Sequence, residues 1–357
     1  MKPFQETLDR TRQRLAELNP EDRRTRLDLF AFVFPGQEAS ASPALVPLGN
    51  GALPQAIMLS PFALGQLLEK VGYPKKLLEA LPGKAVQFDV NWLLQHGLED
   101  RMSLIRVVKG NTARAILGSR YTPLDDFQLL EAAAPYLEGA VVRYEGFGEL
   151  STHITVTWPA EQEGGLERGL HLANSEVGVR AITIEAVAWR VVCGNVLPAI
   201  GGNGDDSFYE SGGRYFRRVR AGAHDLTGGR EGTVKAGWRF IHTGDPQRLV
   251  AFVQDAIADT KRQYDTLLAR WRGALQAQLP DPLGAMEGMV REGDLTSDQF
   301  KRLLEAWAEE KSEFGNSVAG VTNAFTRAAQ AEIDPEERYR LQALGTASLR
   351  TLPAGVR

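Results

Sequence analysis

The sequence predicts an α+β fold with a central antiparallel β-sheet, a helical N-terminal part and a helical C-terminal third. The turn residues Gly110 and Asn111 separate two short runs of strand-forming residues, which indicates a hairpin. Residues 153–158 alternate between polar and apolar side chains, as a half-buried strand does. Beyond Pro246 the apolar residues recur at helical spacing, which predicts helices to the end of the chain.

The N-terminal region, residues 1–100, is predicted to be mostly helical. A first amphipathic helix is expected over residues 2–18. Residues 34–54 are rich in Pro, Gly, Ser and Ala, and this composition predicts a loop. Ser60 and Pro61 follow the order of a helix N-cap and a first helical residue, so another helix is expected to begin there.

The central region, residues 101–244, is predicted to hold the antiparallel sheet. Its first hairpin pairs residues 103–109 with 113–117, and further strands follow as a meander. A basic, glycine-rich loop is expected over 201–239. The C-terminal region, residues 245–357, is predicted to begin with one long helix and to continue as shorter helices.

Composition excludes several classes of protein. The chain has 357 residues and a net charge of −4, so a polyanion site must come from local clusters of Lys and Arg. Cys193 is the one cysteine, which excludes an internal disulfide and fits a reducing cytoplasm. There is no apolar stretch of about 18 residues and no signal-peptide pattern, so we expect a cytoplasmic protein without a membrane segment.

Motifs of known chemistry are missing from the sequence. No phosphate-binding glycine loop is present, and the histidines are scattered singly, without metal-ligand spacing. His153 and His171 could converge across neighbouring strands, although isolated strand histidines are commoner. We therefore assign no catalytic residue, metal or cofactor, and the sequence favours binding over catalysis without settling whether the protein is an enzyme.

A cluster of basic residues is the clearest functional signal. Residues 211–239 carry six Arg and one Lys against two acidic residues. Cations that contact phosphates, interleaved with aromatic rings that stack on bases, are typical of surfaces that bind single-stranded nucleic acid. A solvated charged surface is the alternative. The candidate residues in this cluster and on the first hairpin are Arg106, Lys109, Arg114, Arg120, Tyr121, Arg214, Tyr215, Phe216, Arg217, Arg218, Arg220, Lys235, Trp238 and Arg239.

Four blocks resemble domain-of-unknown-function family 932, which occurs in phages and plasmids. They are the hairpin with its R-Y-x-P stretch, the segment R-V-V-C-G-N-V-L that begins at Arg190, the segment R-F-I-H-T-G-D that begins at Arg239, and a C-terminal helix in which Thr322 replaces the usual aromatic residue. The resemblance spans about residues 106–330. It adds Arg190, Asn195 and His242 to the candidate nucleic-acid-binding residues.

The resemblance implies DNA or RNA transactions of a mobile element, and its outline is similar to single-strand annealing recombinases. The leading hypothesis is a homo-oligomeric protein that binds single-stranded DNA or RNA in repair, recombination or strand annealing. One alternative is a nuclease or ligase with a site around His171, Glu185, Asp205 and Asp206. Another is a non-enzymatic interaction protein of a mobile element. Each version of the leading hypothesis requires the cationic side chains to gather on one surface.

Overall fold

The chain forms two compact units in a computed structural model. The large unit comprises Met1–Asp9, Asp126–Ser175 and Arg180–Arg357, and the small unit comprises Arg10–Asp125 and Glu176–Val179. The structure describes residues 2–34, 42–48, 56–98, 102–163, 165–190, 195–198, 208–210, 215–221, 234–240, 242, 246–261, 264–292 and 295–347.

The small unit is built on a sheet with the strand order β2-β6-β7-β5-β4-β3. Its pairs are antiparallel except for β5 and β7, which run parallel. The strands are β2 (Glu21–Arg26), β3 (Phe30–Val33), β4 (Ala44–Pro47), β5 (Ile57–Leu59), β6 (Met102–Val108) and β7 (Thr112–Gly118). The helices are η1 (Leu27–Leu29), α2 (Pro61–Lys70), α3 (Lys76–Ala80) and α4 (Gly83–His96).

Local sequence signals explain two features of the small unit. The hairpin between β6 and β7 turns at Gly110 and Asn111, whose φ angles of 85° and 56° lie in the left-handed region that these residue types tolerate. Ser60 caps α2 by accepting a hydrogen bond from the Ala63 amide, and Pro61 is the first helical residue. Both predictions are confirmed.

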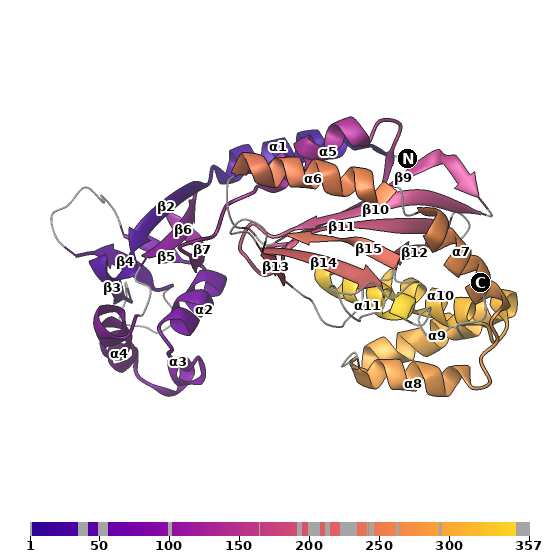
Figure 1. The fold of residues 1–357 in the computed structure, drawn as a ribbon. Coiled ribbons are helices and arrows are strands. Elements are labelled where there is room, and N and C mark those ends of the chain that lie inside the picture. Colours follow the sequence, from indigo (N-terminus) through magenta and orange to yellow (C-terminus); the bar gives the residue numbers. More distant parts are fainter. Residues whose placement is uncertain are drawn as a thin grey trace. The chain divides into compact units, whose positions relative to one another are not determined.

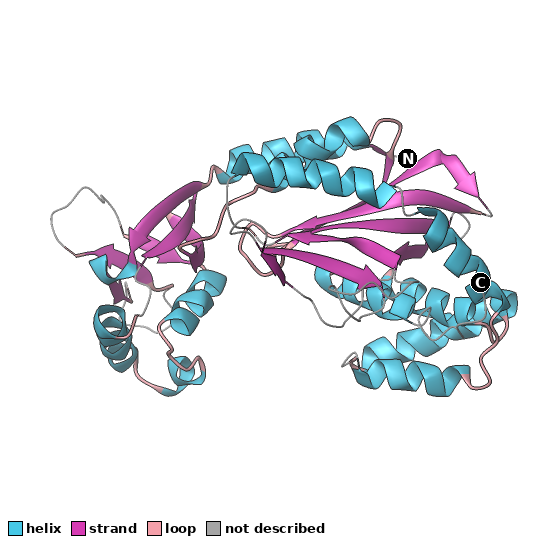
Figure 2. Cartoon of the chain, in the orientation of Figure 1, coloured by secondary structure: helices cyan, strands magenta, loops and turns pink. Residues whose placement is uncertain are grey.

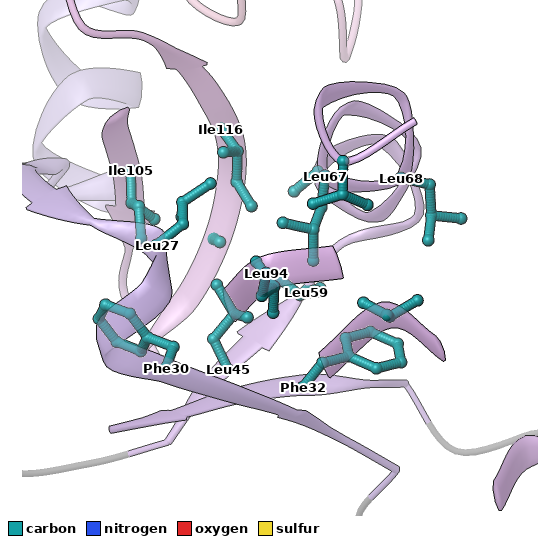
Figure 3. Close-up of a cluster of buried hydrophobic side chains, with 14 of the residues drawn as sticks. Leu27, Phe30, Phe32, Leu45, Leu59, Leu67, Leu68, Leu94, Ile105 and Ile116 are labelled. Carbon is teal, nitrogen blue, oxygen red and sulfur yellow. The ribbon is translucent and has the colours of Figure 1, made fainter. Parts of the chain in front are cut away.

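One continuous hydrophobic core holds the small unit together (Figure 3). Phe30 and Phe32 on β3 and Leu94 on α4 meet Leu67 on α2 and Ile105 on β6 in this core. Strands and helices from residues 27–98 therefore share one core with the first hairpin. This packing differs from the expected boundary near residue 100, and strands accompany the helices that were expected in residues 1–100.

The large unit contains a nine-stranded sheet among its described residues. The order is β1-β8-β9-β10-β11-β15-β14-β13, and β12 also pairs with β11. All of these pairs are antiparallel, which confirms the predicted meander. The strands are β1 (Lys2–Pro3), β8 (Val141–Phe147), β9 (Thr152–Glu163), β10 (Leu166–Asn174), β11 (Ile182–Arg190), β12 (Asn195–Pro198), β13 (Phe208–Glu210), β14 (Tyr215–Ala221) and β15 (Val234–Phe240).

All described residues of the segment 201–239, where a loop is expected, belong to strands. β13, β14 and β15 extend the sheet beyond β11, because β15 pairs with β11 and β14 pairs with β15. The residues between these strands lie outside the described part of the chain. The glycine-rich composition that predicted a loop did not reveal this pairing.

Helices form most of the described C-terminal third, as the sequence predicts. The single long helix expected after Pro246 is two helices, α6 and α7. The N-terminal helix α1 covers Phe4–Leu18, and the other helices are α5 (Asp126–Ala133), η2 (Ala134–Tyr136), α6 (Pro246–Lys261), α7 (Tyr264–Gln276), α8 (Pro282–Glu292), α9 (Ser297–Phe314), α10 (Val318–Ala329) and α11 (Pro335–Ala347). In the part of the chain that the structure describes, none of these helices has the length and hydropathy of a bilayer span.

Helices lie over both faces of the large sheet (Figures 1 and 2), and the two faces carry different side chains. One face carries buried apolar residues such as Val156, Leu170 and Ile184, and α6 and α7 pack on it. The other face carries the alternate residues of the same strands, including Thr155 and Glu185, and α11 packs on it. We call the second face the polar face. Helices thus cover the sheet on both sides.

The core of the small unit yields a stability prediction. Leu67 is fully buried, so Leu67→Ala should lower the free energy of unfolding of this unit by about 2–5 kcal/mol through lost burial and a residual cavity. Leu48→Ala is the control, because the Leu48 side chain is 52% exposed and its loss should change stability by less than about 0.5 kcal/mol. Urea denaturation measures both variants, and equal effects would contradict the core assignment.

Candidate functional site

Five basic residues of the cluster predicted over 211–239 lie on two paired strands of the large sheet. β14 contains Arg217, Arg218 and Arg220, and β15 contains Lys235 and Arg239. The register places Arg217 opposite Arg239 and Arg220 opposite Lys235. Like charges at directly opposite positions destabilise an antiparallel pair. An anion bound between them would remove this repulsion, so these two strands, which we call the basic strand pair, are a candidate anion-binding surface.

Aromatic residues occupy the same two strands. β14 begins with Tyr215 and Phe216, and Trp238 on β15 lies opposite Arg218. β14 also pairs with β13, the last strand in the order of the sheet. Arg214, which was expected to belong to this cluster, lies outside the described residues. The basic strand pair therefore combines both residue types that single-stranded nucleic acids require.

Two candidates on the first hairpin are engaged in ion pairs. The Arg106 side chain is 1% exposed and pairs with Asp125, and its guanidinium lies 3.7 Å from Asp22. Arg114 pairs with Glu176. β6 is buried on both faces, so strand alternation cannot bring Arg106 to the surface. Arg106 and Arg114 therefore already have carboxylate partners, and their expected contact with nucleic acid stays a prediction.

Arg190 is also withdrawn from the surface. It pairs with Glu313, lies 3.5 Å from Glu310, and its guanidinium carbon is 4.4 Å from the centre of the Phe314 ring. Asn195 is its strand partner on β12. A pocket of about 430 Å³ here is lined by Arg190, Glu309, Glu310, Ser312, Glu313, Arg327 and Gln330. Because carboxylates outnumber guanidinium groups in this pocket, it would repel a phosphate. Arg190 connects the sheet to α9 instead.

The remaining candidates divide into exposed and buried residues. Lys109 and Arg120 are exposed on the small unit, and Tyr121 is half-buried. Arg24 was not singled out from the sequence. It donates a hydrogen bond of 2.7 Å to the Tyr121 carbonyl and another to the Ser119 carbonyl. His242 on the large unit is buried, and its expected contact with nucleic acid stays a prediction. Lys109 and Arg120 stay candidates.

A network of buried polar side chains lies on the polar face of the large sheet. His153 on β9 and His171 on β10 are buried, and 3.2 Å separates Nδ1 of His153 from Nε2 of His171. Nδ1 of His171 lies 3.0 Å from the Thr155 hydroxyl. The convergence of these histidines across neighbouring strands, one of two alternatives in the sequence, is confirmed. Buried polar groups of this kind need partners, and each histidine has one.

Helix α11 closes the network. The Tyr339 ring stacks on His171 with centroids 4.6 Å apart and an interplanar angle of 13°. Its hydroxyl donates a hydrogen bond to Glu185 on β11. Glu336 accepts a hydrogen bond of 2.8 Å from Arg180. These contacts tie one helix to β10, to β11 and to the segment before β11, and no sequence motif indicated them.

The network fixes the charge of its members. Burial lowers the pKa of His153, and Arg180 acts in the same direction, whereas Glu336 opposes both. Burial raises the pKa of Glu336, but the hydrogen bond with His153 and the charge of Arg180 outweigh it and lower this pKa to about 2. At neutral pH the network therefore holds a neutral imidazole beside an ionised carboxylate.

The network contains two residues of the alternative enzyme site. His171 and Glu185 are direct cross-strand partners, whereas Asp205 and Asp206 lie outside the described residues. Within the described ranges, no group of three or more His, Cys, Asp or Glu side chains could hold a metal ion. His171 and Glu185 are buried, and both contact Tyr339. In this structure they hold α11 on the sheet.

Comparison with known proteins gives no assignment. No family model, no curated protein and no solved structure matches the chain. The resemblance to family 932 stays a prediction from the four sequence blocks. Any function must therefore be argued from the residues and the geometry.

The buried histidine predicts how stability depends on pH. The pKa of His153 is lower in the folded than in the unfolded state, so the unfolded state binds more protons below about pH 6.5. The melting temperature should therefore fall between pH 7 and pH 5, and His153→Gln should make this decrease smaller. His96→Gln, which changes an exposed histidine on the small unit, is the control. Identical pH profiles for wild type and His153→Gln would contradict the neutral buried imidazole.

Proposed function

We propose that this protein binds single-stranded nucleic acid along the basic strand pair of the large sheet. The observation that carries the proposal is the register, which sets Arg217 opposite Arg239 and Arg220 opposite Lys235. The Cβ atoms of directly opposite residues are about 5 Å apart, and like charges at such positions destabilise the strand pair. Charge-assisted hydrogen bonds to a phosphate would turn this repulsion into binding energy.

The aromatic residues favour single strands over duplexes. Bases in a duplex are stacked on one another, whereas single-stranded bases are free to stack on protein rings. By strand alternation Tyr215 lies on the same side of β14 as Arg217, whereas Phe216 and Trp238 lie on the other side of these two strands. An interface for a single strand needs cations that contact the phosphates and aromatic rings that stack on the bases. A single strand is therefore the ligand that fits this composition.

The proposed interface is smaller than the set of cations in the sequence. We leave Arg106, Arg114 and Arg190 out of the proposed interface because each already pairs with a carboxylate. Lys109 and Arg120 are exposed on the other unit and count as separate contacts. The basic strand pair therefore supplies the central contacts of the proposal.

Strand annealing or repair in a phage- or plasmid-type setting, by a homo-oligomer, is the biological role that we propose for this binding. The resemblance of the four sequence blocks supports this role. Light scattering with and without oligothymidine tests the assembly. A multimer whose mass changes with the oligonucleotide supports annealing, and a monomer with one bound strand supports simple binding.

Removal of one cross-strand pair separates binding from stability. Arg217→Ala/Arg239→Ala should weaken binding of labelled oligothymidine by roughly 25-fold at about 0.1 M salt, since each lost phosphate contact reduces the salt slope by about 0.7. The melting temperature should not fall, because the change also removes a repulsion. Fluorescence polarisation across a salt series measures the slope, which should become shallower by about 1.4.

The matched control removes two positive charges elsewhere on the large unit. Arg291→Ala/Lys301→Ala changes exposed residues of α8 and α9, and should leave the affinity within about twofold. Equal losses in both variants would mean that net charge decides binding, and unchanged affinity in the first variant would remove the basic strand pair from the interface. Cleavage of the oligonucleotide on a denaturing gel would favour the enzyme alternative.

A further inference from the structure

Helix α4 of the small unit carries a line of exposed aromatic residues. Lys84, Phe88, Trp92 and His96 follow one another at intervals of four, which places them on one side of the helix. The Phe88 side chain is 72% exposed and that of Trp92 is 55% exposed. We call these four residues the α4 stripe. Large exposed aromatic residues at contiguous positions mark interaction sites on protein surfaces.

The other side of α4 is firmly attached to the small unit. Val86, Val90 and Leu94 are fully buried in its core. Asn91 accepts a hydrogen bond of 2.7 Å from the Phe32 amide and donates one of 2.9 Å to the Phe32 carbonyl. The helix cannot rotate its stripe inward without breaking these contacts. The exposed aromatic surface is therefore a fixed feature of the fold.

Two rings of the stripe already form a stack. The rings of Trp92 and His96 lie 5.1 Å apart at 25°, and Nδ1 of His96 is 3.0 Å from the Trp92 carbonyl. This contact holds both rings in a fixed orientation. A planar π surface of this kind accepts another flat ring, since offset stacking is the preferred geometry of aromatic pairs.

Positive charge surrounds the α4 stripe. Lys84 is part of it, and Lys75 and Lys76 are exposed at the start of α3, which packs on α4. Asp89 is an acidic residue on the same helix, and after burial its charge is the second cause that raises the pKa of the buried Tyr73 hydroxyl. Lysine is depleted at the centres of protein–protein interfaces, so the combination favours a polyanion with flat rings.

We propose that the α4 stripe stacks on the bases of a single-stranded nucleic acid, with Lys84 beside its phosphates. The proposal rests on the proposed function and adds a contact surface on the small unit. Base–aromatic stacking contributes to affinity for every base, because each base has a π face. The surface therefore requires bases but no particular sequence.

Phe88→Ala/Trp92→Ala tests the stripe with two probes in the full-length protein. One probe is labelled oligothymidine, and the other is an abasic strand of the same length and charge. The affinity for oligothymidine should fall by at least about fivefold, whereas the affinity for the abasic strand should not change. Leu283→Ala/Ile333→Ala removes two exposed apolar side chains from the large unit as the control, and should change neither.

The outcomes separate the stripe from the proposed function. If wild type binds oligothymidine and the variant binds it equally well, the stripe is overturned and the proposed function stands. If wild type binds neither probe, both the proposed role of the α4 stripe and the proposed function are overturned. An equal loss for the two probes would assign the stripe to phosphate or fold effects and overturn stacking. If light scattering without oligonucleotide gives different masses for wild type and Phe88→Ala/Trp92→Ala, stacking on bases is overturned and α4 is a contact between copies of this chain.

Discussion

The pairing of β11 with β15 is the constraint on which the proposed interface depends. β11 lies inside the buried meander, and its register with β15 sets Ile184 opposite Trp238 and Thr183 opposite Arg239. β15 in turn sets Arg239 opposite Arg217 on β14. A shift of one residue in either pairing would exchange the two sides of the added strands. The buried part of the sheet thus determines which cations become neighbours.

Burial on both faces explains why so few of the sheet's polar residues are available to a ligand. The polar face is closed by α11, where Tyr339 and Glu336 provide the partners that His171 and Arg180 need. A buried polar network that is satisfied in this way favours one arrangement of helix and sheet. The basic strands β14 and β15 therefore lie toward one end of the strand order, and the polar residues at the centre of the sheet hold α11 in place.

Local signals predicted local structure, and long-range contacts stayed hidden. The hairpin turn at Gly110 and Asn111 depends on residues next to one another, so composition was enough. The burial of Arg106 depends on β2, whose charged residues give no strand alternation, so its ion pairs could not be foreseen. The stripe residue Phe88 was visible at helical spacing, but Val90 and its neighbours are also apolar, so the sequence did not show which side faces solvent.

The most direct test of the account is a map of the residues that contact a bound strand. Ultraviolet cross-linking of oligothymidine to the full-length protein, followed by mass spectrometry, identifies peptides whose aromatic residues touch the bases. If a single strand binds along the basic strand pair, cross-linked peptides should come from 215–221 and 234–240, the two strands that carry the paired cations. Cross-links confined to other strands or helices, with none in these two segments, would contradict it.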